Sequence, residues 1–272
     1  MSAFLSGEMK DTVQMNPAGA YVLERFFSRK DRQDLFRSWA GSASMWIKGG
    51  DAVWGNASQA PDDEMDATHT HGELVAFRQS AIDSVTSSDT TVNMTSEQAG
   101  SWILQQTPLT FQKMLATNYS FGIERDEASL KRNGLDHTKW TNPLEVQLPK
   151  APSMKIYCVY GHGKETERSY WYAQGGYDQN TASEDYDKET CRDHSSKDCI
   201  AGRSKLGSAL SKETWIDSTF TNDTAMPKVR NGVKMGEGDG TVSLISLGAM
   251  CAEGWKRARW NPAGIKITTV EK

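Results

Sequence analysis

The sequence predicts an α/β fold, because apolar residues follow helical spacing early in the chain and β-prone runs appear later. A first helix is expected to start at Asn16-Pro17, since asparagine caps helices and proline is tolerated at their first position. Strands are expected at residues 154–160 and 265–270, which are rich in β-branched and aromatic side chains. The chain has 272 residues, 37% of them hydrophobic, and can therefore bury a sizeable core.

Capping sequences predict where further helices begin. Residues 28–31 have the form of a capping box and are expected to open a helix that ends before Gly41. A second capping box at residues 95–98 is expected to open a helix that stops before Pro108. Later in the chain, a short strand is expected around Trp215-Ile216 and a helix through residues 247–252.

Two stretches are predicted to be surface insertions. Residues 48–92 are rich in Gly, Ser, Thr and Asp and contain only one short apolar patch, at 74–77. Residues 174–213 are polar and charged and enclose Cys191 and Cys199. These two cysteines could clip a hairpin-like loop as a disulfide, with two free thiols as the alternative.

Charge and hydropathy narrow the range of partners. The chain has 31 basic and 35 acidic residues, a net charge of −4, and no basic stretch dense enough to follow a phosphate backbone, so nucleic acid is not expected as a partner. No run approaches the ~18 apolar residues of a membrane span, and the first eight residues lack the features of a signal peptide. Taken literally, these features indicate a cytosolic protein.

Cysteines and glycosylation sequons favour a secretory compartment instead. Four cysteines permit two disulfides in one of three connectivities. Four acceptor sequons are present where composition predicts about two by chance, and they start at Asn56, Asn93, Asn118 and Asn222. The alternative is four unused sequons and four free thiols in the cytosol.

An acidic turn hinged by glycines is the first candidate catalytic feature. Asp239 lies between Gly238 and Gly240, and the order of strand, glycine turn, acidic loop, short helix and strand is that of the last third of an α/β-hydrolase sheet. The aspartate of a catalytic triad needs such a rigid turn in order to hold the histidine. The alternative is an ordinary Asp-Gly surface turn. The chain has no Gly-x-Ser-x-Gly elbow and no histidine after Asp239.

Other candidate sites are weaker. His69 and His71 follow an acidic stretch at residues 62–66, but a third and fourth metal ligand at standard spacing are missing, so a solvated acidic loop is the better interpretation. No metal and no cofactor are expected. The nine tryptophans could form a lipid-contacting surface, with core and loop packing as the more common alternative.

Short motifs in one order along the chain resemble those of the phospholipid:diacylglycerol acyltransferases, in the lecithin:cholesterol acyltransferase-like branch of the α/β-hydrolases. The resemblance covers almost the whole chain but only the C-terminal part of that family. The matching motifs lie at residues 6–12, 21–29, 45, 48–50, 53–55, 141–145, 154–158, 166–168, 238–242 and 261–266.

The resemblance implies an enzyme that moves an acyl chain from a phospholipid donor to a diacylglycerol acceptor, through a serine acyl-enzyme, at a membrane surface. It implies that Asp239 is the triad acid and that Cys158 and Cys251 form a disulfide. It also implies the endoplasmic reticulum lumen, in agreement with the sequons. The serine and histidine of the triad, and the membrane anchor, are expected to lie outside residues 1–272, which would form one incomplete α/β-hydrolase domain that is inactive alone.

The sequence departs from the family pattern at His162 and Glu165, which stand where an aliphatic residue and a proline are usual, and in the polar segment 174–213, which is longer than in the secreted relatives. His162 is not expected to be the missing base, because it precedes the acid whereas the family histidine follows the last strand. Two other functions stay open: a phospholipase or water-using transacylase of the same branch, and a non-catalytic fragment that binds lipid or a partner.

Overall fold

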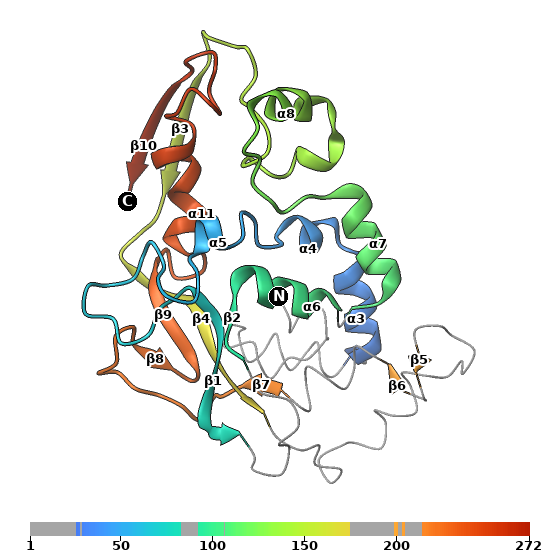
Figure 1. Cartoon of the computed structure of the whole chain (residues 1–272), viewed down its shortest axis with the longest axis vertical. Coiled ribbons are helices and arrows are strands. Elements are labelled where there is room, and N and C mark those ends of the chain that lie inside the picture. Colours follow the sequence, from blue (N-terminus) through green and yellow to red (C-terminus); the bar gives the residue numbers. More distant parts are fainter. Residues whose placement is uncertain are drawn as a thin grey trace.

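The computed structural model describes residues 26–27, 29–82, 92–105, 107–174, 199–200, 203–204 and 214–272. Figure 1 shows helices α3, α6 and α7 on one side of a sheet that contains β1, β4 and β9. The helix expected from Asn16 onward, up to residue 25, lies outside the described residues. Within the described part of the chain, no helix is long and apolar enough to cross a membrane.

Helices predominate in the first half of the chain, and some of them share a core. Their bounds are α3 Arg29–Ser38, α4 Ala40–Ser44, α5 Asp51–Trp54, α6 Ser96–Gln105, α7 Leu109–Asn118 and α8 Glu127–Arg132, with short 3₁₀ turns η1 Asn133–Leu135 and η2 His137–Lys139. Trp46 packs with Phe111 and Leu115 in this core. Helix α3 agrees with the predicted start near residues 28–31 and ends before Gly41.

The capping box at the start of α6 forms as the sequence predicts. The Thr95 backbone N–H donates to Gln98 Oε1 at 3.0 Å, and the Gln98 N–H points back at Thr95 Oγ1 at a long 3.5 Å. These bonds satisfy N–H groups that have no partner inside a helix. The helix ends at Gln105, before Pro108.

The larger sheet is mostly antiparallel. Its strands are β1 Glu73–Ile82, β2 Met94–Thr95, β4 Lys164–Gln174, β7 Thr214–Ile216, β8 Val229–Arg230 and β9 Val233–Gly238. Their order is β2-β1-β4-β9-β8, with β7 also paired to β4, and only β1 and β4 run parallel. Helix α6 covers one face, where Ala99 packs against Val75 and Tyr172.

Part of the expected insertion at residues 48–92 lies in this sheet. Strand β1 stands between β2 and β4, and Val75 and Ala76 are 2% and 0% exposed. The surface interpretation fails there because a strand buried on both faces has a short continuous apolar run without alternation. The residues that directly follow Phe77 in β1 are polar. The charge of Arg78 is neutralised by Asp217, because Arg78 Nη2 lies 2.6 Å from Asp217 Oδ2.

Little of the second expected insertion, residues 174–213, belongs to the described chain. Its described pieces are β5 Cys199–Ile200 and β6 Arg203–Ser204, which pair as a small antiparallel hairpin. Cys191 lies outside the described residues, and so does the proposed Cys191–Cys199 disulfide.

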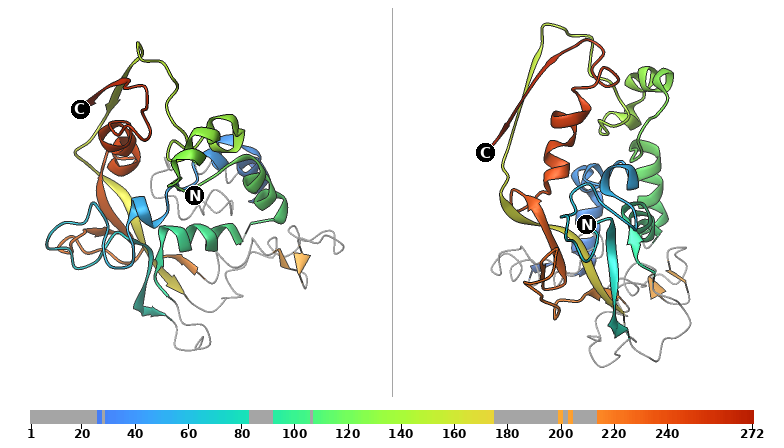
Figure 2. Two further views of the ribbon diagram at one scale, coloured as in Figure 1. Left: turned by 45° about the horizontal axis from the view of Figure 1, so that its top comes forward. Right: turned by 60° about the vertical axis from the view of Figure 1, so that its left-hand side comes forward.

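A separate parallel pair of strands carries the C-terminal end. Strand β3 Lys155–Tyr160 pairs along its length with β10 Lys266–Glu271, so that Cys158 stands opposite Thr269. Helix α11 Leu244–Ala249 and the π-helical turn η4 Met250–Gly254 pack beside them (Figure 2). The predicted strands near 154–160 and 265–270, and the helix through 247–252, are therefore present. As a whole the fold is mixed α/β.

Candidate active site

The Asp239 turn follows directly from the end of β9. The Asp239 N–H donates to the Val242 carbonyl at 3.2 Å, and Gly238 bridges to Ser243. The N–H groups of Thr241 and Val242 both donate to Asp239 Oδ1, each at 2.8 Å. A side-chain oxygen that accepts backbone N–H groups two and three residues ahead fixes a tight turn.

The two glycines beside Asp239 are required by the local backbone. A Cβ on Gly238 would lie 2.2 Å from the Val242 carbonyl oxygen, closer than atoms can approach. Gly240 has φ +95°, a conformation that residues with a Cβ rarely adopt. The Gly-Asp-Gly sequence is thus the one that lets the chain make this turn.

The carboxylate of Asp239 is held in its charged form. The N–H groups of Val242 and Thr241 lower the pKa of Asp239 below its usual value, with a smaller contribution from Lys164. Both backbone hydrogen bonds end on Oδ1. Within the part of the chain that the structure describes, Oδ2 accepts no hydrogen bond, so this oxygen is available to a partner N–H.

The carboxyl ends of β3 and β10 meet beside this turn. Gly161, which follows β3, approaches Asp239 so closely that a Cβ would lie 3.3 Å from the Asp239 Cβ. The same glycine lies next to the Lys272 carbonyl, which accepts the His162 N–H at 3.0 Å. The acid therefore stands at the edge where both parallel strands end, where α/β proteins commonly place their sites.

His162 lies near the turn but pairs with another acid. Its Nδ1 is 3.4 Å from Glu237 Oε1, and both side chains are exposed. Glu237 also accepts the Gly163 N–H at 3.2 Å. Among the described residues no hydrogen bond joins His162 to Asp239.

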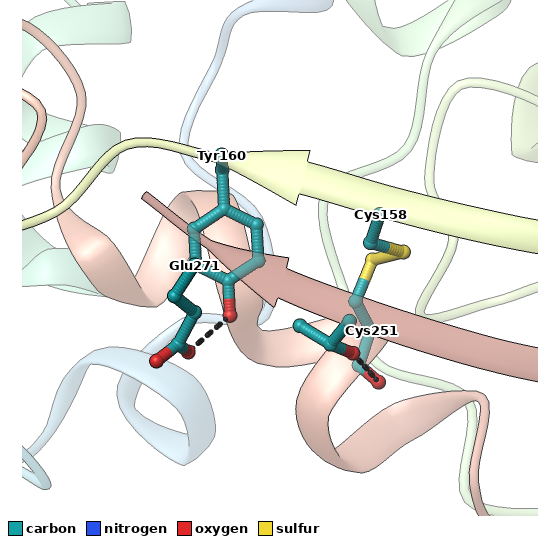
Figure 3. Close-up of a disulfide and its surroundings, with 5 residues drawn as sticks. Cys158, Tyr160, Cys251 and Glu271 are labelled. Atoms are coloured by element: carbon teal, nitrogen blue, oxygen red, sulfur yellow. Dashed lines mark hydrogen bonds between the residues drawn. A yellow bond between two sulfur atoms is a disulfide. The ribbon is translucent and has the colours of Figure 1, made fainter.

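A disulfide fastens the strand before the site to the helix after it (Figure 3). Cys158 on β3 is bonded to Cys251 in η4, with 6.2 Å between their Cα atoms, and the two residues are 93 positions apart in sequence. Beside it, the Tyr160 hydroxyl donates to Glu271 at 2.7 Å, and the Thr269 hydroxyl donates to the Cys251 carbonyl at 3.2 Å. The π-helical turn η4 is thus held covalently to β3.

A second cluster of polar side chains is buried in the larger sheet. His71 Nδ1 lies 2.9 Å from Ser169 Oγ, a spacing that is also found between a nucleophile and its base. Ser169 is 0% and His71 3% exposed, however, so no substrate reaches this hydroxyl. The pair therefore has a structural role.

Arg168 is the centre of this buried cluster. Its guanidinium is 1% exposed and binds the Asp62 carboxylate with two hydrogen bonds, of 2.7 and 2.9 Å. It also donates to the Trp54 carbonyl at 2.9 Å and lies over the Trp54 ring. The ion pair ties β4 to the loop that precedes β1, 106 residues away in sequence.

Replacing Asp62 by alanine is expected to lower the free energy of unfolding by about 3 kcal/mol, because a buried guanidinium is left without its anion. Urea unfolding of the chain measures this loss. Asp223→Ala is the matched control, since it breaks an ion pair with Arg230 in which both side chains are exposed, and a change of about 0.5 kcal/mol or less is expected there. Equal losses in the two variants would contradict a special role for the buried pair.

His71 gives the fold a dependence on pH. Burial, together with the nearby positive charge of Arg168, lowers the pKa of His71 to about 4. Unfolding restores the ordinary value, so the unfolded chain binds a proton that the folded chain refuses. Stability is full above the ordinary histidine pKa and is lost as pH falls toward 4.

Between pH 7 and pH 5 this linkage is expected to remove about 2 kcal/mol of stability. His71→Asn keeps a polar group near Ser169 and does not titrate, so its stability should change less over this range. His137, exposed at η2, provides the control, and His137→Asn should keep the wild-type dependence. Urea unfolding at both pH values tests the difference, and an unchanged slope in His71→Asn would count against this assignment.

The described residues contain no group of three or more side chains that could hold a metal ion. His69 is exposed and its ring packs edge-on against Trp171, while His71 is buried. Only part of the acidic stretch is solvated: Glu64 and Asp66 are exposed, but Asp62 binds Arg168 and Asp63 accepts hydrogen bonds from Thr70 and the His71 backbone. The solvated-loop interpretation therefore holds for two of these four acids.

Sequence reasoning missed the role of Arg168. This residue belongs to the motif Thr166-Glu167-Arg168 that carries part of the family resemblance, but motif matching alone does not say what its side chain contacts. The nine tryptophans do not share one environment: Trp46 is buried and Trp54 contacts Arg168, while Trp39 and Trp140 are 48% and 64% exposed.

The whole chain, residues 1–272, matches the family described as "Lecithin:cholesterol acyltransferase". The chain belongs to this family.

Several curated relatives are phospholipid:diacylglycerol acyltransferases. The one from Schizosaccharomyces pombe is 37% identical over 271 residues, which cover 100% of this chain and 36% of the relative. The one from Saccharomyces cerevisiae is 34% identical over 272 residues, covering 99% of this chain and 34% of the relative. Phospholipid:diacylglycerol acyltransferase 1 from Arabidopsis thaliana is 32% identical over 152 residues, covering 56% of this chain and 18% of the relative. The chain thus spans about a third of the length of the two yeast relatives. No solved structure matches it.

Proposed function

We propose that this chain supplies the catalytic acid, Asp239, of an acyltransferase that moves an acyl chain from a phospholipid to diacylglycerol. The observation that carries the proposal is the Asp239 turn, which keeps one carboxylate oxygen on backbone N–H groups and leaves the other available. The relatives are named phospholipid:diacylglycerol acyltransferases, and the substrates of the proposal are taken from these names.

In the proposed reaction Asp239 acts on a histidine and not on the substrate. Its carboxylate accepts the imidazole N–H, selects the tautomer that can take a proton from a serine, and stabilises the imidazolium that forms. The serine attacks the phospholipid ester, and lysophospholipid leaves. The diacylglycerol hydroxyl then attacks the acyl-enzyme and gives triacylglycerol. We assign this serine and histidine to segments outside residues 1–272, so that the chain is the C-terminal portion of an α/β-hydrolase domain.

We place the site on the lumenal side of the endoplasmic reticulum, at a membrane surface. The Cys158–Cys251 disulfide supports an oxidising compartment. The sequons give further support, since Asn56 and Asn118 are exposed, whereas Asn93 and Asn222 are partly buried. Phospholipid and diacylglycerol are membrane lipids, and this is the reason for proposing a membrane surface. Digestion of the protein from its native cell with a glycosidase should shift its mass if any of these sequons is used.

A hybrid enzyme tests the function. In this hybrid, residues 1–272 replace the matched third of the Schizosaccharomyces pombe relative. Mixed with phosphatidylcholine and diacylglycerol, it should form triacylglycerol and lysophospholipid, whereas the chain alone should form neither. Free fatty acid as the main product would replace the proposal with a phospholipase. A folded hybrid that binds lipid but transfers no acyl chain would favour a non-catalytic role.

A further inference from the structure

We propose that Thr166 is a positioning residue for Asp239, acting through the backbone of the acid turn. This inference rests on the proposed function of Asp239. Thr166 lies on β4, opposite Gly236 of β9, and its side chain is 0% exposed. Its hydroxyl is 74 residues away from the turn in sequence, yet it is in direct contact with the turn.

The hydroxyl of Thr166 is oriented toward the turn by its own hydrogen bonds. It donates to the Lys164 carbonyl at 3.0 Å, which leaves its lone pairs to accept the Gly240 N–H at 2.8 Å. A hydroxyl that donates becomes a better acceptor, so the two bonds strengthen each other. The peptide unit that joins Asp239 to Gly240 is therefore attached to the strand.

Thr166 also contacts the glycine on the other side of the acid. A Cβ on Gly238 would lie 2.7 Å from Thr166 Oγ1 and 3.0 Å from Thr166 Cβ. The threonine thus fills the space that a side chain at residue 238 would need. One buried residue contacts the chain both before and after Asp239, and the acid cannot shift along the sheet while these contacts hold.

The Asp239 side chain does not supply this restraint. Its Oδ1 binds the N–H groups of Thr241 and Val242, which fixes the shape of the turn. Backbone pairing of Lys164 with Gly238 and Asp239 holds the start of the turn on β4, and the hydrogen bond from Gly240 to Thr166 extends this hold to the peptide after the acid. A triad acid displaced by about 1 Å can cost a factor on the order of 100 in rate, so the contact matters for catalysis more than for folding.

The structural half of the inference is tested by amide hydrogen exchange on the hybrid enzyme without substrate, a measurement that needs no catalysis. Thr166→Val keeps the shape and removes the hydroxyl, and the peptide that covers residues 238–243 should exchange roughly three- to tenfold faster. Thr166→Ser keeps the hydroxyl and should exchange as the wild type does. Unchanged exchange in Thr166→Val would overturn the proposed restraint.

The catalytic half is tested in the hybrid enzyme. Thr166→Val should lower kcat roughly 10- to 100-fold with KM little changed, and Thr166→Ser should restore kcat to within about threefold of the wild type, because its hydroxyl can make the same bonds. The matched control is Thr107→Val, which removes a hydroxyl that donates to the Leu104 carbonyl from a residue 2% exposed and distant in sequence from the turn. Thermal unfolding of all variants separates loss of fold from loss of position.

The outcomes distinguish the inference from the function on which it rests. If Asp239→Asn abolishes activity but Thr166→Val behaves like Thr107→Val, Thr166 is not a positioning residue and the proposed function stands. If Asp239→Asn leaves activity intact, the proposed function fails, and exchange at residues 238–243 still decides the structural contact. A fall in kcat that Thr166→Ser does not reverse would also overturn the inference, since it would point to packing and not to the hydroxyl.

Discussion

Asp239→Asn is expected to lower the kcat of the hybrid enzyme on the order of 10⁴-fold, the loss that accompanies this exchange of a triad aspartate in serine hydrolases. Asparagine keeps an oxygen that can accept the N–H groups of Thr241 and Val242, so the turn should keep its shape. What changes is the other position, where an amide nitrogen replaces Oδ2. An amide donates a hydrogen bond to histidine, favours the wrong tautomer and cannot stabilise imidazolium. The initial rate of triacylglycerol formation measures the loss.

Glu237→Gln is the matched control for this experiment. Glu237 is two residues from Asp239 and is also acidic, but it is exposed and binds His162 and the Gly163 N–H. Its loss should change kcat by less than about threefold, because an exposed ion pair contributes little. Comparable losses in both variants would mean that the turn contributes a general negative charge and not one positioned carboxylate.

Removing the Cys158–Cys251 disulfide is expected to lower the free energy of unfolding by about 4 to 5 kcal/mol, the estimate for a closed loop of roughly this length. The bond joins residues 93 positions apart. Breaking it gives the unfolded chain many more conformations, and it also separates η4 from β3 beside the acid turn. The double variant Cys158→Ala with Cys251→Ala, compared with wild type by urea unfolding, measures the change.

Thr269→Val provides a control for the disulfide experiment. It removes the hydroxyl that donates to the Cys251 carbonyl but leaves the disulfide in place, and it should cost only about 1 kcal/mol. Addition of a reductant should destabilise the wild type by several kcal/mol more than the double variant, in which only Cys191 and Cys199 are left. A wild type that is as stable reduced as oxidised would contradict the stabilising role of this bond.

Several local features could be predicted from the sequence because their causes lie within a few residues. The capping box at residues 95–98 forms within one helical turn, and the helix stops before Pro108. The glycines beside Asp239 are explained by the turn that they make. The motif order also indicated the family, to which the whole chain belongs.

Other features could not be predicted, because their partners are distant in sequence. The composition of residues 74–77 does not distinguish a surface loop from a strand. Only the pairing of β1 with β4 places these residues in the core. In the sequence, Arg168 cannot be told from a surface charge, because its partners Asp62 and the Trp54 carbonyl are brought to it only by the fold. The acidic stretch at residues 62–66 is a further case, because burial in the fold decides which of its carboxylates are bound.

The acid turn combines both kinds of information. The sequence by itself determined the conformation of the turn, because glycines that tolerate a tight backbone and an aspartate that binds nearby N–H groups act within a few residues of each other. Only the tertiary structure decided where this turn lies. The turn contacts Thr166, lies beside Gly161 and the end of β10, and precedes the helical segment whose turn η4 is joined to β3 by a disulfide. Local hydrogen bonds are set by neighbouring residues, whereas contacts between distant strands depend on the register in which the sheet has formed.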